Sequence, residues 1–70
     1  MSMITPGTLL LNKGDRSNWY VLLSYEVVGD SVRDVVWFNI KNNVILNRYS
    51  IACSSLTQAA LGNHYIIIEP

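Results

Sequence analysis

Short apolar runs alternate with short polar breaks along the whole chain. The breaks contain Gly, Asn, Asp, Lys, Ser or Pro, which favour turns, and they fall at 6–7, 12–15, 29–31, 41–43 and 62–63. The runs between them are rich in β-branched and aromatic side chains, which suit the pleated surface of a sheet. This pattern predicts strands at 8–11, 19–28, 34–40, 44–51 and 64–69.

Alternation within each strand predicts which side chains face the core, because successive side chains point to opposite sides of a sheet. In the second strand the polar Ser24 and Glu26 indicate that one side is exposed to solvent. The opposite side, which includes Leu23, is therefore expected to be buried. In the third strand the side that carries Phe38 is uniformly apolar and is expected in the core, which leaves Trp37 facing outward. The fourth strand shows no clear preference.

Residues 54–62 are the segment that favours a helix. Ser55, with Gln58 three residues later, matches a capping box, and Gly62 supplies a C-terminal stop. The apolar residues between them form a stripe of one or two turns, which is stable only when it packs against the sheet. The predicted fold is therefore all-β, a five-stranded small barrel with one short helix before the last strand.

Composition limits the size and the setting of the protein. Seventy residues make a single domain, 1–70, with a small core. Five Lys and Arg balance five Asp and Glu, and this zero net charge argues against extended nucleic acid and anionic membranes as partners. The apolar run at 65–68 is too short to span a bilayer. The single Cys53 and the lack of a signal sequence favour a reducing cytoplasm.

The sequence contains few groups suited to catalysis. A Cys/His pair would require Cys53 and His64 to meet in space, and the more usual role for such a cysteine is that of a small buried filler. The acidic residues are scattered, and neither a zinc-ligand set nor a Gly-rich phosphate loop is present in the sequence. We therefore expect a protein that is not an enzyme and uses no cofactor and no metal.

The opening of the chain resembles that of small SH3-like barrels. Pro6 and Gly7 form the turn that leads into a short apolar strand, and a loop at 12–17 then precedes a long second strand. This resemblance implies a five-stranded SH3-like barrel. The loop carries a single acidic residue, unlike the acidic first loop of peptide-binding SH3 domains, so recognition of proline-rich peptides is not expected. Small size, abundant Asn and the lack of a catalytic motif also resemble the accessory proteins of bacteriophages.

Aromatic residues carry the prediction of a binding site. Seven of them are more than so small a core encloses, and Trp and Tyr favour interface hot spots. Guanidinium groups beside aromatic faces around the middle hairpin could stack a base and pair with a phosphate. The candidate residues for binding a ligand or partner are Trp19, Tyr20, Arg33, Trp37, Arg48, Tyr49 and His64.

These observations predict a non-catalytic binding module, a phage-type accessory protein or inhibitor that obstructs or sequesters a host component. The component is either a protein surface or a small nucleotide signal. The alternatives are a nucleic-acid-binding adaptor and a structural component of a larger particle. Because strand edges with few charges invite pairing with another chain, we also expect a homo-oligomer.

Overall fold

A computed structural model of the chain describes residues 3–70, apart from the side chains of residues 48 and 49. The strands are β1 (Leu9–Asn12), β2 (Trp19–Val28), β3 (Ser31–Asn39), β4 (Val44–Ala52) and β5 (Tyr65–Ile68). A 3-10 turn, η1 (Cys53–Leu56), and a single-turn helix, α1 (Gln58–Leu61), lie between β4 and β5. The prediction of an all-β fold with a short helix before the last strand is confirmed, and β3 begins three residues earlier than expected.

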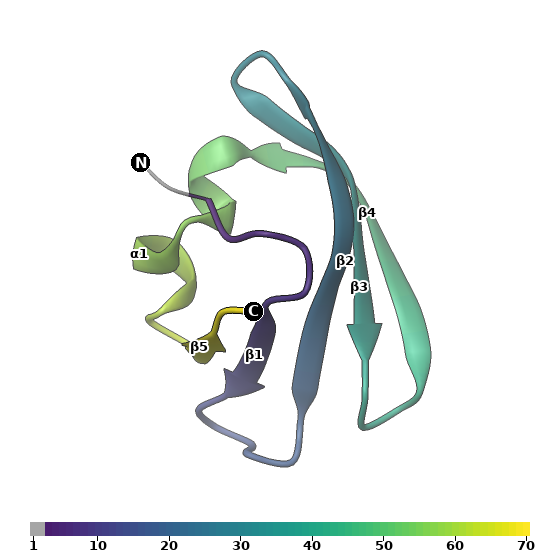
Figure 1. The fold of residues 1–70 in the computed structure, drawn as a ribbon, viewed down its shortest axis with the longest axis vertical. Helices are drawn as coiled ribbons and strands as arrows, with labels where there is room; N and C mark the ends of the chain where they lie inside the picture. Colours follow the sequence, from purple (N-terminus) through teal and green to yellow (C-terminus); the bar gives the residue numbers. More distant parts are fainter. Residues whose placement is uncertain (1–2) are drawn as a thin grey trace.

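The five strands form one antiparallel sheet in the order β4-β3-β2-β1-β5. β2 pairs with β1 through its first residues and with β3 along nearly its whole length. The sheet curls, so that β1, β5 and α1 lie across from the β2–β3–β4 part (Figure 1). Within residues 3–70, β4 and β5 are edge strands that do not pair with each other, which leaves the sheet open.

The ladder between β2 and β3 changes register twice between Leu22 and Glu26. One shift coincides with Asp34, whose φ of 53° lies in the left-handed region. A β-bulge adds a residue to one strand and resets the alternation of side chains along it. As a result Arg33 and Asp34 are both exposed, whereas Val35 is buried.

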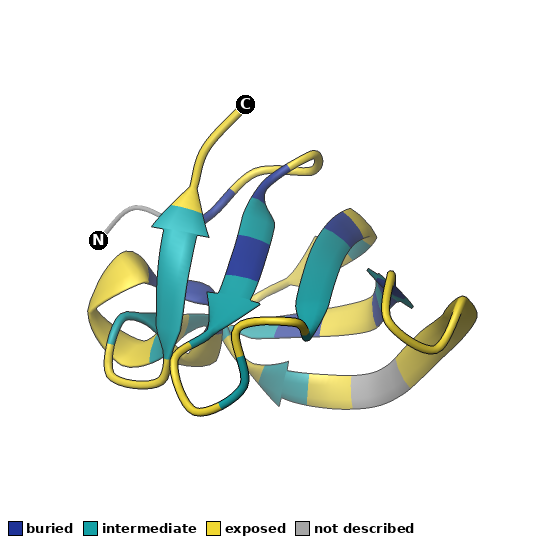
Figure 2. Cartoon of the chain, turned by 90° about the horizontal axis from the view of Figure 1, so that it is seen from below, coloured by how far each residue is buried: buried dark blue, intermediate teal, exposed yellow. Residues whose placement is uncertain are grey.

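The core is small and is built from β1, β2, β3, η1 and the segment before β1. Its buried apolar residues are Ile4, Leu10, Leu22, Val32, Val35, Trp37 and Leu56. Figure 2 shows that exposed positions dominate β4 and the turns, whereas buried positions concentrate in the inner strands.

The predicted core face is wrong for β3 and for the first part of β2. Leu22 is fully buried and Leu23 is 42% exposed, so before the register shift the core lies on the side of β2 that was expected to be solvent-exposed. Beyond the shift the prediction is confirmed, since Ser24 and Glu26 are exposed and Tyr25 packs against the core. Trp37 is 8% exposed and belongs to the core, whereas Phe38, on the opposite side of β3, is only half-buried. Ser24 is exposed because the register shift after Leu22 pairs it with Val36, on the side of the sheet opposite the core residues Val35 and Trp37.

Asn39 explains why the Trp37 side of β3 looked polar. This residue is 2% exposed, yet both ends of its amide are satisfied. Its Nδ2 donates to Oδ1 of Asn18 at 2.8 Å, and its Oδ1 accepts from the backbone N–H of Asn42 at 2.8 Å. A buried amide with its hydrogen bonds made carries little desolvation penalty, so a polar residue in the pattern does not mark a solvent-facing side.

The expected helix over 54–62 is broken at Thr57, which has an extended backbone. The Thr57 hydroxyl accepts a hydrogen bond from the backbone N–H of Ala60 at 3.3 Å, so Thr57 is the N-cap of α1. The prediction of Ser55 as the N-cap is therefore wrong. Gly62 ends the helix as predicted.

Asp15 links the loop between β1 and β2 to the turn after β3 through an ion pair with Lys41. Its carboxylate accepts a hydrogen bond from Lys41 Nζ at 2.6 Å and from the hydroxyl and backbone N–H of Ser17 at 2.7 and 3.1 Å. These contacts, with Lys41 as the largest cause, lower the pKa of Asp15 to about 2 from its usual value of 3.8.

A titration of Asp15 tests this contact directly. Because the pKa is lower in the folded state than in the unfolded state, the stabilisation is present above the usual pKa and is lost as the pH falls through about 2. We expect the side-chain carboxyl carbon, followed by NMR, to titrate with a midpoint of about 2 while the amide spectrum remains folded. Lys41→Met should raise the midpoint only part of the way, since Ser17 still donates. An unshifted midpoint in the wild type would contradict the contact.

Candidate functional site

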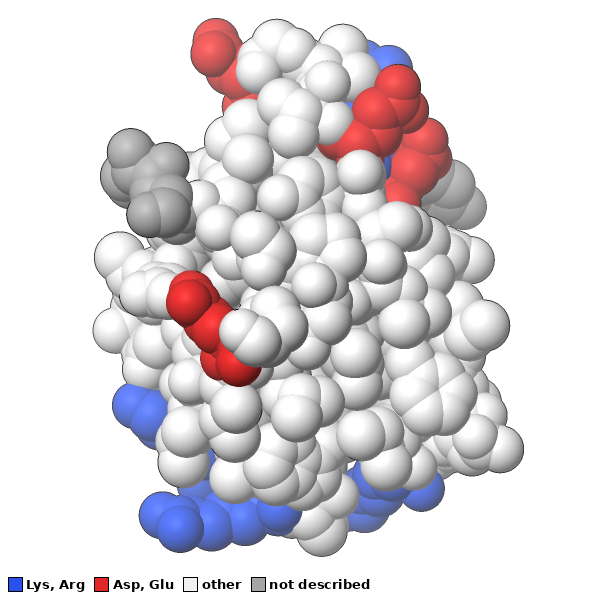
Figure 3. All heavy atoms as spheres, in the orientation of Figure 1, with Lys and Arg blue, Asp and Glu red and all other residues white. Residues whose placement is uncertain are grey.

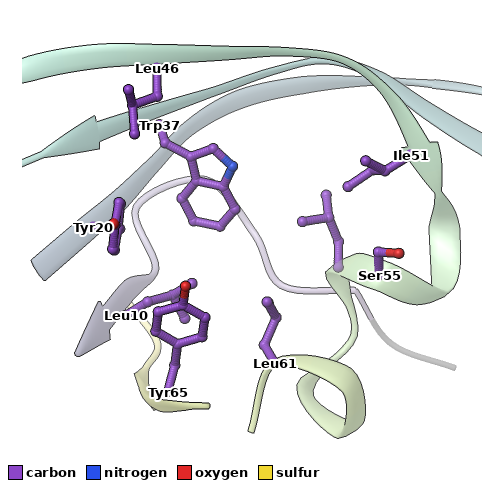
Figure 4. Close-up of a pocket in the computed structure, with 9 residues that line it drawn as sticks. Leu10, Tyr20, Trp37, Leu46, Ile51, Ser55, Leu61 and Tyr65 are labelled. Atoms are coloured by element: carbon purple, nitrogen blue, oxygen red, sulfur yellow. The ribbon is translucent and has the colours of Figure 1, made fainter. Parts of the chain in front are cut away.

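The inner side of the curled sheet forms a partly open pocket with a volume of about 250 Å³. It lies between the β2–β3–β4 part of the sheet and the segment that runs from η1 to β5 (Figure 4). The lining residues are mostly apolar or aromatic. They are Leu10, Tyr20, Trp37, Leu46, Ile51, Ser55, Leu56, Leu61 and Tyr65.

Three aromatic side chains from three different strands give the pocket its walls. Tyr20 comes from the start of β2, Trp37 from β3 and Tyr65 from the start of β5. The rings of Tyr20 and Tyr65 meet edge to face, with centroids 6.0 Å apart and planes at 86°, an arrangement that aromatic pairs favour. Figure 4 shows the Trp37 indole projecting from β3 into the space, with Leu61 on the far side.

The pocket also contains hydrogen-bonding groups that the fold leaves available. The indole N–H of Trp37 donates to none of the described residues, and it reaches solvent, since every fully buried side-chain nitrogen or oxygen among the described residues has a partner. The Tyr20 hydroxyl lies 3.2 Å from Nδ2 of Asn18 and accepts from it. None of the described lining residues is charged.

The structure brings together two of the residues predicted for the site. Trp37 and Tyr20 line the pocket, although Trp37 was expected to face outward. Trp19 lies outside the lining and is half-buried, one position before Tyr20 on β2. Arg33 is exposed beyond the bulge at Asp34 and lies outside the described lining of the pocket.

The remaining candidates contribute little to the described pocket. His64 is exposed in the turn before β5, where its carbonyl accepts the backbone N–H of Lys13 at 3.0 Å. Arg48 and Tyr49 belong to β4, and the backbone of Arg48 lies opposite Val35, but their side chains are outside the described residues.

Sequence reasoning missed the contribution of the segment after β4. Ser55, Leu61 and Tyr65 close one side of the pocket, and none was predicted there. Tyr65 meets Tyr20 because β1 pairs with both β2 and β5. That long-range pairing has no local signature in the sequence, whereas a surplus of aromatic residues for so small a core was a usable signal.

Outside the pocket, the described residues offer few groups for metal binding or for reactions of a thiol. No group of three or more His, Cys, Asp or Glu within residues 3–70 is placed to hold a metal ion. Cys53 is a free, half-buried thiol that packs against the core. In the part of the chain that the structure describes, no helix has the length and apolar character needed to cross a membrane.

Comparisons of the chain with protein-family models, with curated proteins and with solved structures find no match.

Proposed function

We propose that this chain is a non-catalytic binding module that obstructs a partner protein by accepting one of its apolar side chains, aromatic or branched, into the pocket. The observation that carries this function is the pocket itself, with a volume of about 250 Å³, aromatic walls and no charged group among the described lining residues. Apolar anchors buried in such pockets dominate the binding energy of many protein interfaces.

The volume of the pocket favours a single side chain over a larger ligand. Pockets for drug-sized ligands hold roughly 300–1,000 Å³, and this one falls below that range. A six-membered ring or a branched aliphatic group would fit within it, and the indole N–H of Trp37 would donate a hydrogen bond to one polar atom of the incoming group.

The exposed edge of β4 supports a protein as the partner. Leu46 and Ile51 line the pocket from this strand, whose outer edge is unpaired within the described residues. An extended segment of a partner could therefore add to the sheet along β4 and place one side chain in the pocket. Backbone hydrogen bonds would provide general affinity, and the pocket would select the side chain.

Sequestration of a nucleotide signal has less support than obstruction of a protein. Phosphates are bound by Arg, Lys or clustered backbone N–H groups, and the described lining has no cationic side chain. A nucleic-acid-binding adaptor and a structural component of a larger particle are supported by no feature of the described residues.

The proposal also includes the class and the finer fold of the protein, a phage-type accessory protein that folds as a small SH3-like barrel. The position of β1 between β2 and β5, with helical turns before the last strand, supports the SH3-like arrangement.

An NMR titration with N-acetylphenylalanine amide, a small analogue of an aromatic side chain, tests the pocket. We expect saturable shifts of the Trp37 indole N–H and the Leu61 methyl groups, with a dissociation constant on the order of 1 mM. Leu46→Trp, at an exposed pocket-lining position, should fill the entrance and weaken binding by roughly tenfold or more. Ile68→Trp is the matched control, because Ile68 is 44% exposed, close to the 41% of Leu46, and lies outside the pocket lining.

Two outcomes would overturn the proposal. Shifts spread over the surface without saturation would show that the pocket does not bind the probe. Tighter binding of AMP than of adenosine would show that a phosphate contributes, and it would move the proposal to nucleotide sequestration.

A further inference from the structure

The outer side of the sheet, which faces away from the pocket, is mostly apolar across three strands. Val21, Phe38 and Ile45 are direct register partners on β2, β3 and β4 and form one row across the sheet. Together with their neighbours on the same side they form the outer face. Its residues are Val21, Val36, Phe38, Ile40 and Ile45, together with the polar Ser24 and Asn47, which are the register partners of Val36.

The exposure of the outer face is unusual for an antiparallel sheet in water. Sheets with one solvated side normally carry mostly polar residues there, whereas five of the seven residues of this face are apolar. Ile45 is 60% exposed and Ile40 is 47% exposed. Contiguous apolar surface of this kind marks an interaction site.

The distribution of charge indicates what covers this face. At the end of the sheet with the β2–β3 turn, Glu26, Asp30 and Asp34 outnumber Arg33, so the described charges sum to −3 + 1 = −2. Figure 3 shows most of the acidic side chains on the visible face at one end of the molecule and most of the basic side chains at the other.

The opposite end carries the matching charge. There the β1–β2 loop and the β3–β4 turn contribute Lys13, Arg16 and Lys41 against Asp15, a sum of +3 − 1 = +2. The described charges at the two ends are therefore equal and opposite, and the described residues of the outer face between them carry no charge. A second copy of this chain has a complementary surface when it is turned end for end.

We propose that a second copy of this chain packs on the outer face, as a two-fold dimer of stacked sheets whose strands run antiparallel across the interface. Two-fold stacking of one face on itself allows two alignments. An axis along the strands places like-charged ends together, and an axis across the strands places the acidic end over the basic end. The charge distribution selects the second alignment.

The dimensions of the chain are compatible with this interface. Specific interfaces bury about 800 Å² per partner, which is somewhat under a fifth of the 4493 Å² that the chain exposes. Stacked sheets lie about 10 Å apart, close enough to bury the whole Val21–Phe38–Ile45 row from both copies. The pockets remain open on the two outer sides of the dimer, so this inference does not depend on the proposed function.

Sedimentation velocity of the wild type and of Ile45→Lys tests the dimer. At about 100 µM, a concentration at which a dimer with a micromolar dissociation constant is mostly formed, the wild type should sediment as a species of 2 × 7.9 = 15.8 kDa. Ile45→Lys should sediment as the 7.9 kDa monomer, with an unchanged circular dichroism spectrum. If that variant does not fold, Ile45→Thr, which keeps a β-branched side chain, should weaken the dimer by roughly tenfold.

The control is Val27→Lys, which places the same charge at a residue 50% exposed and paired with the buried Val32 on the other side of the sheet. This variant should remain a dimer. A monomeric wild type, a dimeric Ile45→Lys or a monomeric Val27→Lys would each overturn the proposal. The dissociation constant should also rise between about 0.05 and 0.5 M NaCl, because salt screens the attraction between the ends. A dissociation constant that falls with added salt would overturn the antiparallel alignment.

Discussion

Leu22→Ala is expected to lower the free energy of unfolding by about 2–5 kcal/mol, whereas Leu23→Ala should cost less than about 1 kcal/mol. The two residues are adjacent on β2 and have the same side chain, but Leu22 is fully buried and Leu23 is 42% exposed. Removal of the Leu22 side chain leaves a cavity among the six other buried core residues, and so few neighbours have little freedom to close it.

The loss at Leu22 is large relative to the whole stability of the protein. At roughly 0.05–0.15 kcal/mol per residue, 70 residues give a total of about 3.5–10 kcal/mol, so this substitution would remove about a fifth of the stability or more. Urea denaturation at two protein concentrations measures the effect and separates any contribution from association. Similar losses for both variants would contradict the burial of one side of β2 and the exposure of the other.

Trp37→Ala should be the other severe substitution, with a loss of about 3–5 kcal/mol. The Trp37 ring is 8% exposed and belongs both to the core and to the wall of the pocket, so its removal destabilises the fold and enlarges the binding site together. Thermal and urea unfolding measure the loss, and Trp37→Phe should recover part of it because a smaller ring still fills the core.

Trp19 provides the comparison for this substitution. It is half-buried on the other side of the sheet and lies outside the pocket, so Trp19→Ala should cost clearly less than Trp37→Ala and should leave binding of the phenylalanine analogue within roughly twofold. A larger loss of stability at Trp19 than at Trp37 would contradict the assignment of Trp37 to the core.

The strands were predictable because each has a local signature. Turn residues separate apolar runs of strand length, and the observed bounds of four of the five strands lie within about two residues of the predicted ones. The end of the helix at Gly62 was also predictable, because the glycine itself is a local signal. The N-cap was missed because Ser55 and Thr57 both have hydroxyl groups suited to capping, and only the extended backbone at Thr57 decides between them.

The faces of the strands were not predictable from alternation. The bulge at Asp34 resets the side-chain pattern in the middle of β3, and a bulge has no reliable signal in a single sequence. Asn39 looked solvent-facing because its partner Asn18 lies 21 residues away in the chain. The same limit applies to the pocket, where Tyr20 and Tyr65 are 45 residues apart and meet only through β1.

The position of β1 between β2 and β5 also determines how this protein folds. β1 to β4 are joined by short connections and pair with their neighbours in the chain, whereas β5 pairs with β1, more than 50 residues earlier. Closing such a long segment costs conformational entropy before any contact repays it, which slows folding to the range of milliseconds to seconds. During that delay the hairpins exist without the segment that closes the pocket. The pocket is therefore the last part of the molecule to form and the first to be lost when β5 detaches.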